Sequence, residues 1–115
     1  MLTQSYDRPA AGNLVPLLQS IANEIRDRRI AIKKLDLALL SSTPESDQAL
    51  NLQADRANHR KEMRLAMKEI TRLGCSVARE HPLRVLIPGR SGEFDGFVWD
   101  AGETTVQAMT ADSAA

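Results

Sequence analysis

Two long stretches of helical spacing, separated by one short break, constrain this chain more than any other feature. The first stretch places apolar residues at intervals of four and three, which gathers them on one side of a helix as in a heptad repeat. This seam contains Leu14, Leu18, Ile21, Ile25, Ile32, Leu35 and Leu39, with Arg28 in the one skipped place. Asn13 and Pro16 suit the helix start, because Asn caps free N–H groups and Pro is tolerated in the first turn.

A second seam follows the segment SSTPESD, in which Thr43 is the expected cap and Pro44 the expected first helical residue. Its positions are Ala49, Leu52, Arg56, His59, Met63, Ala66, Ile70 and Leu73. Gly74 supplies a left-handed helix end. Because the connection is short, the second helix should fold back against the first. The sequence therefore predicts a long, coiled-coil-like antiparallel hairpin with helices at about 13–41 and 44–73.

After Gly74 the spacing changes from helical to alternating, which indicates strands. Four short segments qualify, and turn residues separate them: CSVARE, LRVLIP, FDGFVWD and TTVQAM. Short connections favour a small antiparallel β-meander of three to four strands within 75–109. The predicted fold is α+β, with a single domain over 13–110, a flexible N-terminal arm over 1–12 and a disordered tail over 111–115.

Charge and cysteine content limit the classes of function. The formal net charge is zero, which argues against a nucleic-acid partner and gives no attraction to a membrane. Basic residues exceed acidic ones by three over 14–73, and acidic exceed basic by three from Gly74 onward, which fits either intersubunit attraction or chance. The single Cys75 excludes an internal disulfide, and no segment has the pattern of a signal peptide or membrane span. We therefore expect a cytoplasmic protein without a membrane partner.

Both seams become polar at the same height of the predicted hairpin. Arg28 of the first helix should lie beside Arg56 and His59 of the second, with Arg60 nearby. Three interpretations remain open: a salt-bridged layer that sets helix register, a contact with acids of a second subunit, or a site for phosphate or carboxylate. In each interpretation the cationic side chains have an anionic partner, because burying unpaired cations costs much free energy. The nearest acids in the sequence are Glu24, Asp27, Asp55 and Glu62.

The sequence argues against an enzyme, and we expect no catalytic residue, metal or cofactor. Cys75 and His81 form a nucleophile–base pair only on paper, since a cysteine that opens a strand after a helix is more often packed and inert. The metal-ligand spacings CxxC and HExxH do not occur. The glycines around Arg90 lack the following helix of a phosphate loop. Phe97 and Trp99 fall on one strand face, where core packing is favoured over base stacking.

Apolar residues outside the two seams indicate a further partner. These are Leu17, Ile30 and Leu37 on the first helix and Leu50, Leu65 and Met67 on the second. Either a second subunit covers them, or the strands pack along the hairpin of a monomer. We expect a non-enzymatic, homodimeric interaction module whose protein partner is unknown. The alternative is a small-anion or nucleotide-binding protein that uses Arg28, Arg56, His59 and Arg60.

The order of these features resembles an uncharacterised prokaryotic family, domain of unknown function 2203. The similar pieces, which together cover about 13–110, are LVPLLQSIANEIRDRRIAIKKL, ITRLGCSV, LRVLIPG, FVWDAGE and TTVQAM. The most specific are the Pro-containing helix start and Trp99 followed by Gly102-Glu103. The family pattern has an Asp and an aromatic before the Pro of the second strand, a Cys before the Trp, and Trp-His at the last strand. This chain has Leu86-Ile87, Val98 and Met109-Thr110 there. The resemblance therefore implies the fold, for a divergent member without those polar residues, and no function.

Overall fold

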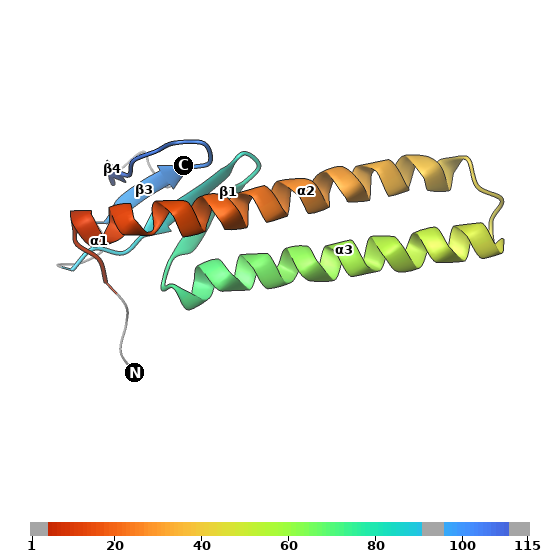
Figure 1. Ribbon diagram of the computed structural model, residues 1–115, viewed down its shortest axis with the longest axis horizontal. Helices are drawn as coiled ribbons and strands as arrows, with labels where there is room; N and C mark the ends of the chain where they lie inside the picture. The colour runs from red at the N-terminus through yellow and green to blue at the C-terminus, as the bar shows by residue number, and fades with distance from the viewer. Residues whose placement is uncertain (1–4, 91–95, 111–115) are drawn as a thin grey trace. The chain divides into compact units, whose positions relative to one another are not determined.

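The computed structural model describes residues 5–90 and 96–110 and shows the predicted α+β fold (Figure 1). A long helical hairpin comes first along the chain, and a four-stranded antiparallel sheet follows. The elements are α1 (Arg8–Asn13), α2 (Val15–Leu40), α3 (Asp47–Arg72), β1 (Ser76–Glu80), β2 (Leu83–Ile87), β3 (Phe97–Asp100) and β4 (Gln107–Ala108). In the described part of the chain, no helix has both the length and the apolar character needed to cross a membrane.

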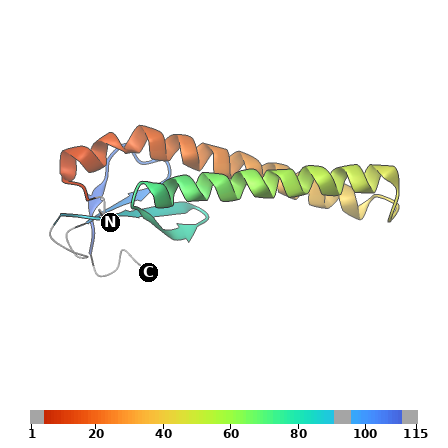
Figure 2. The ribbon, with the colours of Figure 1, turned by 90° about the horizontal axis from the view of Figure 1, so that it is seen from below.

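The hairpin helices α2 and α3 contain 26 residues each and run antiparallel, joined by residues 41–46 (Figures 1 and 2). The start of α3 differs from the prediction, because the helix begins at Asp47 and not at Pro44. Ser46 is its cap, since the Ser46 Oγ accepts a hydrogen bond from the Ala49 backbone N–H at 3.1 Å. Glu45 has a φ of 65°, a left-handed conformation that interrupts any helix starting before it.

The end of α3 follows the prediction at Gly74. Gly74 has a φ of 81°, and its N–H donates to the Thr71 carbonyl at 2.9 Å. The Cys75 N–H donates to the Ile70 carbonyl at 3.2 Å. Together these two bonds form a Schellman motif, which satisfies carbonyl groups that the last helical turn leaves without partners.

The N-terminal segment, where we expect a flexible arm over 1–12, is described from residue 5 onward. Helix α1 occupies Arg8–Asn13, with Pro9 in its first turn and Asp7 as its cap. The Asp7 carboxylate accepts a hydrogen bond from the Ala10 N–H at 2.9 Å. Tyr6 donates from its N–H to the Pro88 carbonyl at 2.9 Å and from its hydroxyl to the Leu73 carbonyl at 2.7 Å. Residues 1–4 and the expected tail over 111–115 lie outside the described residues.

The four strands pair in chain order, each antiparallel to the next. In β2, Leu83, Val85 and Ile87 are buried and alternate with less buried residues, as expected for a strand with one face on a core. The fourth strand contains only Gln107–Ala108 and is shorter than the predicted TTVQAM segment. The predicted third strand begins earlier than Phe97, and the part over 94–95 lies outside the described residues.

Internal contacts divide the chain into two compact units. One contains Met1–Ala22 and Lys68–Ala115, and its largest fully buried side chains are Leu18, Ile70, Val85, Ile87 and Trp99. The other, Asn23–Met67, is the remainder of the helical hairpin, which we call the hairpin unit. Its buried apolar residues are Ile25, Ala49 and Ala66. The first unit therefore has a core built around large side chains, whereas the core of the hairpin unit is narrow.

Trp99 belongs to the core, as the alternation of β3 predicts. Its side chain is fully buried, and the indole Nε1–H donates to the Glu103 carbonyl at 2.8 Å. Gly102, at a φ of 95°, turns the chain after β3, and its N–H donates to Gln19 Oε1 at 2.9 Å. The Trp99 and Gly102-Glu103 signature is thus explained by packing and turn formation.

Candidate polar site in the helical hairpin

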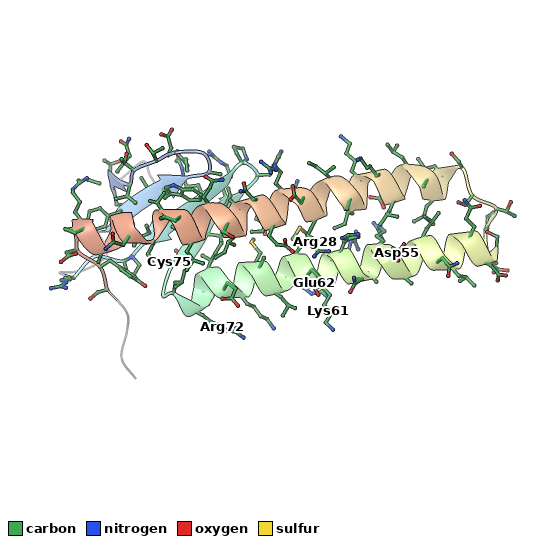
Figure 3. The ribbon with its side chains drawn as sticks, in the orientation of Figure 1. Arg28, Asp55, Lys61, Glu62, Arg72 and Cys75 are labelled. Atoms are coloured by element: carbon green, nitrogen blue, oxygen red, sulfur yellow. The ribbon has the colours of Figure 1, made fainter. Side chains whose placement is uncertain are left out.

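The structure brings Arg28 of α2 and His59 of α3 into contact, as the two seams predict. Arg28 points from α2 toward α3 (Figure 3), and its Nη1 lies 3.0 Å from His59 Nδ1. A guanidinium only donates hydrogen bonds, so Nδ1 must accept this one. The hydrogen bond joins the two helices at one defined height.

The positive charge of Arg28 is balanced within its own helix. Glu24 lies one turn earlier, and its Oε1 accepts a hydrogen bond from Arg28 Nε at 2.8 Å. The Arg28 and Glu24 side chains are 26% and 44% exposed, so the pair lies at the edge of the seam. Glu24 is one of the four acids that the sequence places near the layer.

The partner of Arg56 is Asp36 of α2, which the sequence reasoning missed. Arg56 Nε forms an ion pair with Asp36 Oδ1 across the hairpin, and the two side chains are 31% and 45% exposed. The Arg56 Nε atom is buried, and Asp36 Oδ1 is its ion-pair partner. Asp36 lies two helical turns beyond Arg28, beside the first seam and not on it. Only the stagger of the two helices brings it to Arg56.

The remaining predicted residues lie apart from this contact network. Arg60 is exposed, and the described residues offer it neither a hydrogen bond nor an ion pair. Asp55 and Glu62 likewise have no such partner in the described part of the chain. Asp27 contacts Arg26 of its own helix at 3.4 Å, and both side chains are exposed.

The polar layer, defined here as Glu24, Arg28, Asp36, Arg56 and His59, has no excess positive charge. The Arg28 guanidinium pairs with the Glu24 carboxylate, and the Arg56 guanidinium pairs with the Asp36 carboxylate. A site for phosphate or carboxylate needs cationic donors that the protein itself has left uncompensated. The observed ion pairs are those expected of a layer that fixes the register of the hairpin, and a ligand site stays a prediction.

A second polar cluster lies on the sheet and was not predicted. Arg84 of β2 stands opposite Asp100 of β3, and it donates from Nε and Nη2 to the two carboxylate oxygens at 2.7 and 3.0 Å. Arg79 Nη2 lies 3.6 Å from the same carboxylate. The hydrogen bond from Arg84 lowers the pKa of Asp100. This cross-strand pair can be identified only when the register of the two strands is known, and the sequence alone does not specify that register.

Cys75 and His81 do not form a nucleophile–base pair in the structure. Cys75 is buried, and this burial raises the pKa of its thiol to about 11. At neutral pH the side chain is therefore a protonated, weak nucleophile. Its Sγ lies 4.0 Å from the Leu73 carbonyl oxygen, whereas His81 is exposed after the end of β1. Among residues 5–90 and 96–110, no three His, Cys, Asp or Glu side chains are grouped as metal ligands.

Fold and site together define a class of protein: an α+β chain with a long helical hairpin, a neutralised polar layer inside that hairpin, and a small antiparallel sheet. The chain belongs to the family of uncharacterized conserved proteins called domain of unknown function 2203, whose sequence profile matches residues 4–112. The match confirms the resemblance noted from the helix start and the Trp99 segment. No curated protein and no solved structure matches the chain. Any function must therefore be argued from the physical properties of the chain itself.

Proposed function

We propose that this protein is a non-enzymatic interaction module that binds a second copy of itself through the hairpin unit. The proposal is based on the narrow core of that unit. Five apolar seam residues there remain partly exposed: Ile32, Leu35, Leu39, Leu52 and Met63. Two helices alone cannot enclose the apolar surface between them, and helical proteins enclose it by packing further helices against the pair.

The dimensions of the hairpin unit suit such an association. Its two helical segments are each about 30 Å long at ~1.5 Å per residue, and a helix with side chains is about 10 Å wide. Side by side they offer a face of roughly 600 Å² on each side of the hairpin, against about 800 Å² per partner in a standard protein interface. One face of the hairpin is therefore close to the area that a stable contact requires.

The chemistry of the polar groups supports a non-enzymatic role. The one cysteine has a pKa of about 11 and is buried, so it is a poor nucleophile at neutral pH. The carboxylates near Arg28 and Arg56 neutralise these cations rather than standing free as general bases. These groups are arranged as structural contacts.

Sedimentation equilibrium of the full chain, from about 1 to 100 μM, tests the proposal because self-association makes the average mass depend on concentration. We expect the mass to rise above that of the monomer. Leu35→Ser removes a partly buried seam residue and should weaken association, whereas Lys34→Ser, at an exposed polar residue of the same helix, should leave it unchanged. Circular dichroism would verify that both variants keep their helices. A monomer throughout the range would contradict the proposal.

Anion binding at Arg28, Arg56, His59 and Arg60 stays a prediction that the same preparation can test. An anion would have to displace the carboxylates of Glu24 and Asp36. A melting temperature that rises with phosphate concentration, and no longer does so in Arg56→Ala, would support it. An unchanged melting temperature would leave the interaction module as the better account.

A further inference from the structure

The charged residues beside the seam of the hairpin unit separate by sign. We define the basic face as Arg29, Lys33, Arg60 and Arg64, and the acidic face as Glu24, Asp27, Asp55 and Glu62. Each face takes two residues from α2 and two from α3. All eight belong to the hairpin unit, Asn23–Met67.

Helix geometry places these two groups on opposite sides of the hairpin. Successive residues turn by about 100° around a helix axis. Measured from the direction that faces the other helix, Arg29 and Lys33 lie roughly 80–120° further around α2. Arg60 and Arg64 lie roughly 70–110° around α3 in the same sense. Because the helices are antiparallel, the same sense leads to the same side of the hairpin. The four acids are rotated by roughly 60–120° in the opposite sense and lie on the other side.

Two observed contacts support this assignment independently. The same geometry puts Asp36 and Arg56 on the basic side of the seam, and these two residues form an ion pair across the helices. It puts Arg28 and His59 on the acidic side together with Glu24, and Arg28 contacts both of the others. The ion pairs of the polar layer therefore lie beside the seam. Glu24 belongs to both the polar layer and the acidic face, and the other charges of the two faces lie outside the pairs.

The basic face has no partner within the described residues. None of its four side chains forms a hydrogen bond or an ion pair in that part of the chain. Arg29 and Lys33 are four residues apart, as are Arg60 and Arg64, and like charges at that spacing destabilise a helix. Such an arrangement is self-repelling in an isolated hairpin.

The acidic face is also available to a partner. Asp55 and Glu62 have no hydrogen bond or ion pair among the described residues. Glu24 and Asp27 contact arginines of their own helix, and their side chains remain 44% and 65% exposed. The chain thus displays two oppositely charged faces on one hairpin.

We infer that the basic face of one hairpin binds the acidic face of a second copy. This inference rests on the proposed self-association and names the surfaces that carry it. The partly exposed apolar seam between the helices is flanked by basic residues on one side and acidic residues on the other, as the a and d positions of a coiled coil are flanked by e and g. Two basic faces repel each other, and so do two acidic faces. When a basic face meets an acidic face, the apolar seam is covered and opposite charges meet beside it.

This contact is heterologous, because the two copies use different surfaces. Each copy then keeps one face free, so association continues into a ring or an open chain unless a face is blocked. A contact of this kind predicts a specific response to mutation that a two-fold symmetric dimer does not share.

Two charge-reversed variants test the inference in the full-length protein. Arg60→Glu/Arg64→Glu disables the basic face, and Asp55→Lys/Glu62→Lys disables the acidic face. Lys61→Glu/Lys68→Glu is the matched control: it makes the same charge change on α3, and Lys61 points away from α2 (Figure 3). Sedimentation velocity and native mass spectrometry would be measured at low and high salt for each variant alone and for an equimolar mixture. Circular dichroism would establish that all variants are folded.

We expect each reversed variant alone to associate at least about tenfold more weakly than the parent chain, and the control to behave like the parent. The equimolar mixture should associate again, because the intact acidic face of one variant meets the intact basic face of the other. Association of the parent should weaken as salt rises. Unchanged association of both reversed variants would overturn the inference while leaving the proposed function intact. A parent chain that stays monomeric would overturn both the inference and the proposed function.

Discussion

Burial controls the chemistry of Cys75, the residue that follows the Schellman turn at the end of α3. Its pKa of about 11 lies above the ordinary value, so thiolate is scarce at neutral pH and its fraction rises about tenfold for each pH unit up to that value. At pH 8 we expect a disulfide reagent to modify the folded protein about a hundredfold more slowly than the protein in guanidinium chloride.

The control for this prediction is the pH profile in guanidinium chloride, where the rate should level off near the ordinary thiol pKa of about 8.5. The folded protein should instead show a rate that still increases above pH 10. Rapid modification of the native protein at pH 8 would mean that the thiol is accessible and ionised. Cys75 would then return as a candidate nucleophile.

Single contacts in the polar layer show what a seam pattern can and cannot predict. Arg28 and His59 interrupt their seams at the same height, and this coincidence was sufficient to place them together. Asp36 was missed because it lies beside the seam, where the partner depends on helix stagger. The pair of Arg84 and Asp100 was missed for the corresponding reason in a sheet, since a shift of one residue exchanges the two faces of a strand.

The ends of the elements are set by caps, and two glycines allow this to be measured. Gly74 closes α3 at a φ of 81°, a conformation that disfavours any residue with a Cβ. We expect Gly74→Ala to lower the free energy of unfolding by about 1–2 kcal/mol, measured by urea denaturation. Gly12 provides the control, because it lies in α1 at an ordinary φ and an added methyl group would meet no atom outside that helix within 4 Å.

Gly12→Ala should leave stability unchanged or raise it by about 0.5–1 kcal/mol, since alanine is the better helix former and restricts the unfolded chain. A Gly74→Ala variant as stable as the parent would show that the end of α3 relaxes without the left-handed residue. The cap assignment would then need revision.

Elements with a periodic pattern were predictable, and ends and very short elements were not. The seams of α2 and α3 repeat over several turns, so the helices followed from spacing and their antiparallel packing from the short connection. The start of α3 did not, because Thr43, Ser46 and Pro44 are all acceptable near a helix start and only the backbone at Glu45 excludes the earlier choice. Helix α1 contains six residues, which is too few for a period to be recognised.

At the scale of the whole molecule, the two units differ in how they exclude water. The unit that contains the sheet encloses large side chains completely, including Trp99, Leu18 and Ile70. In the hairpin unit, two of the three buried apolar residues are alanines, and most of the seam stays partly exposed. Local opening should therefore cost less free energy in the hairpin unit, and the proposed self-association would cover the same partly exposed seam.

Native-state hydrogen exchange of the dilute protein measures this difference directly. We expect the amides of β2 and β3 to exchange only through global unfolding, and those within 23–40 and 47–67 to exchange at least about tenfold faster, a gap of ~1.4 kcal/mol. Raising the protein concentration should slow exchange in the hairpin unit and leave β2 and β3 unaffected, because the proposed contact covers only the hairpin. Equal protection throughout the dilute chain would mean that the two units open as one. Protection of the hairpin that is independent of concentration, in a sample that nevertheless associates, would locate the contact between copies outside Asn23–Met67.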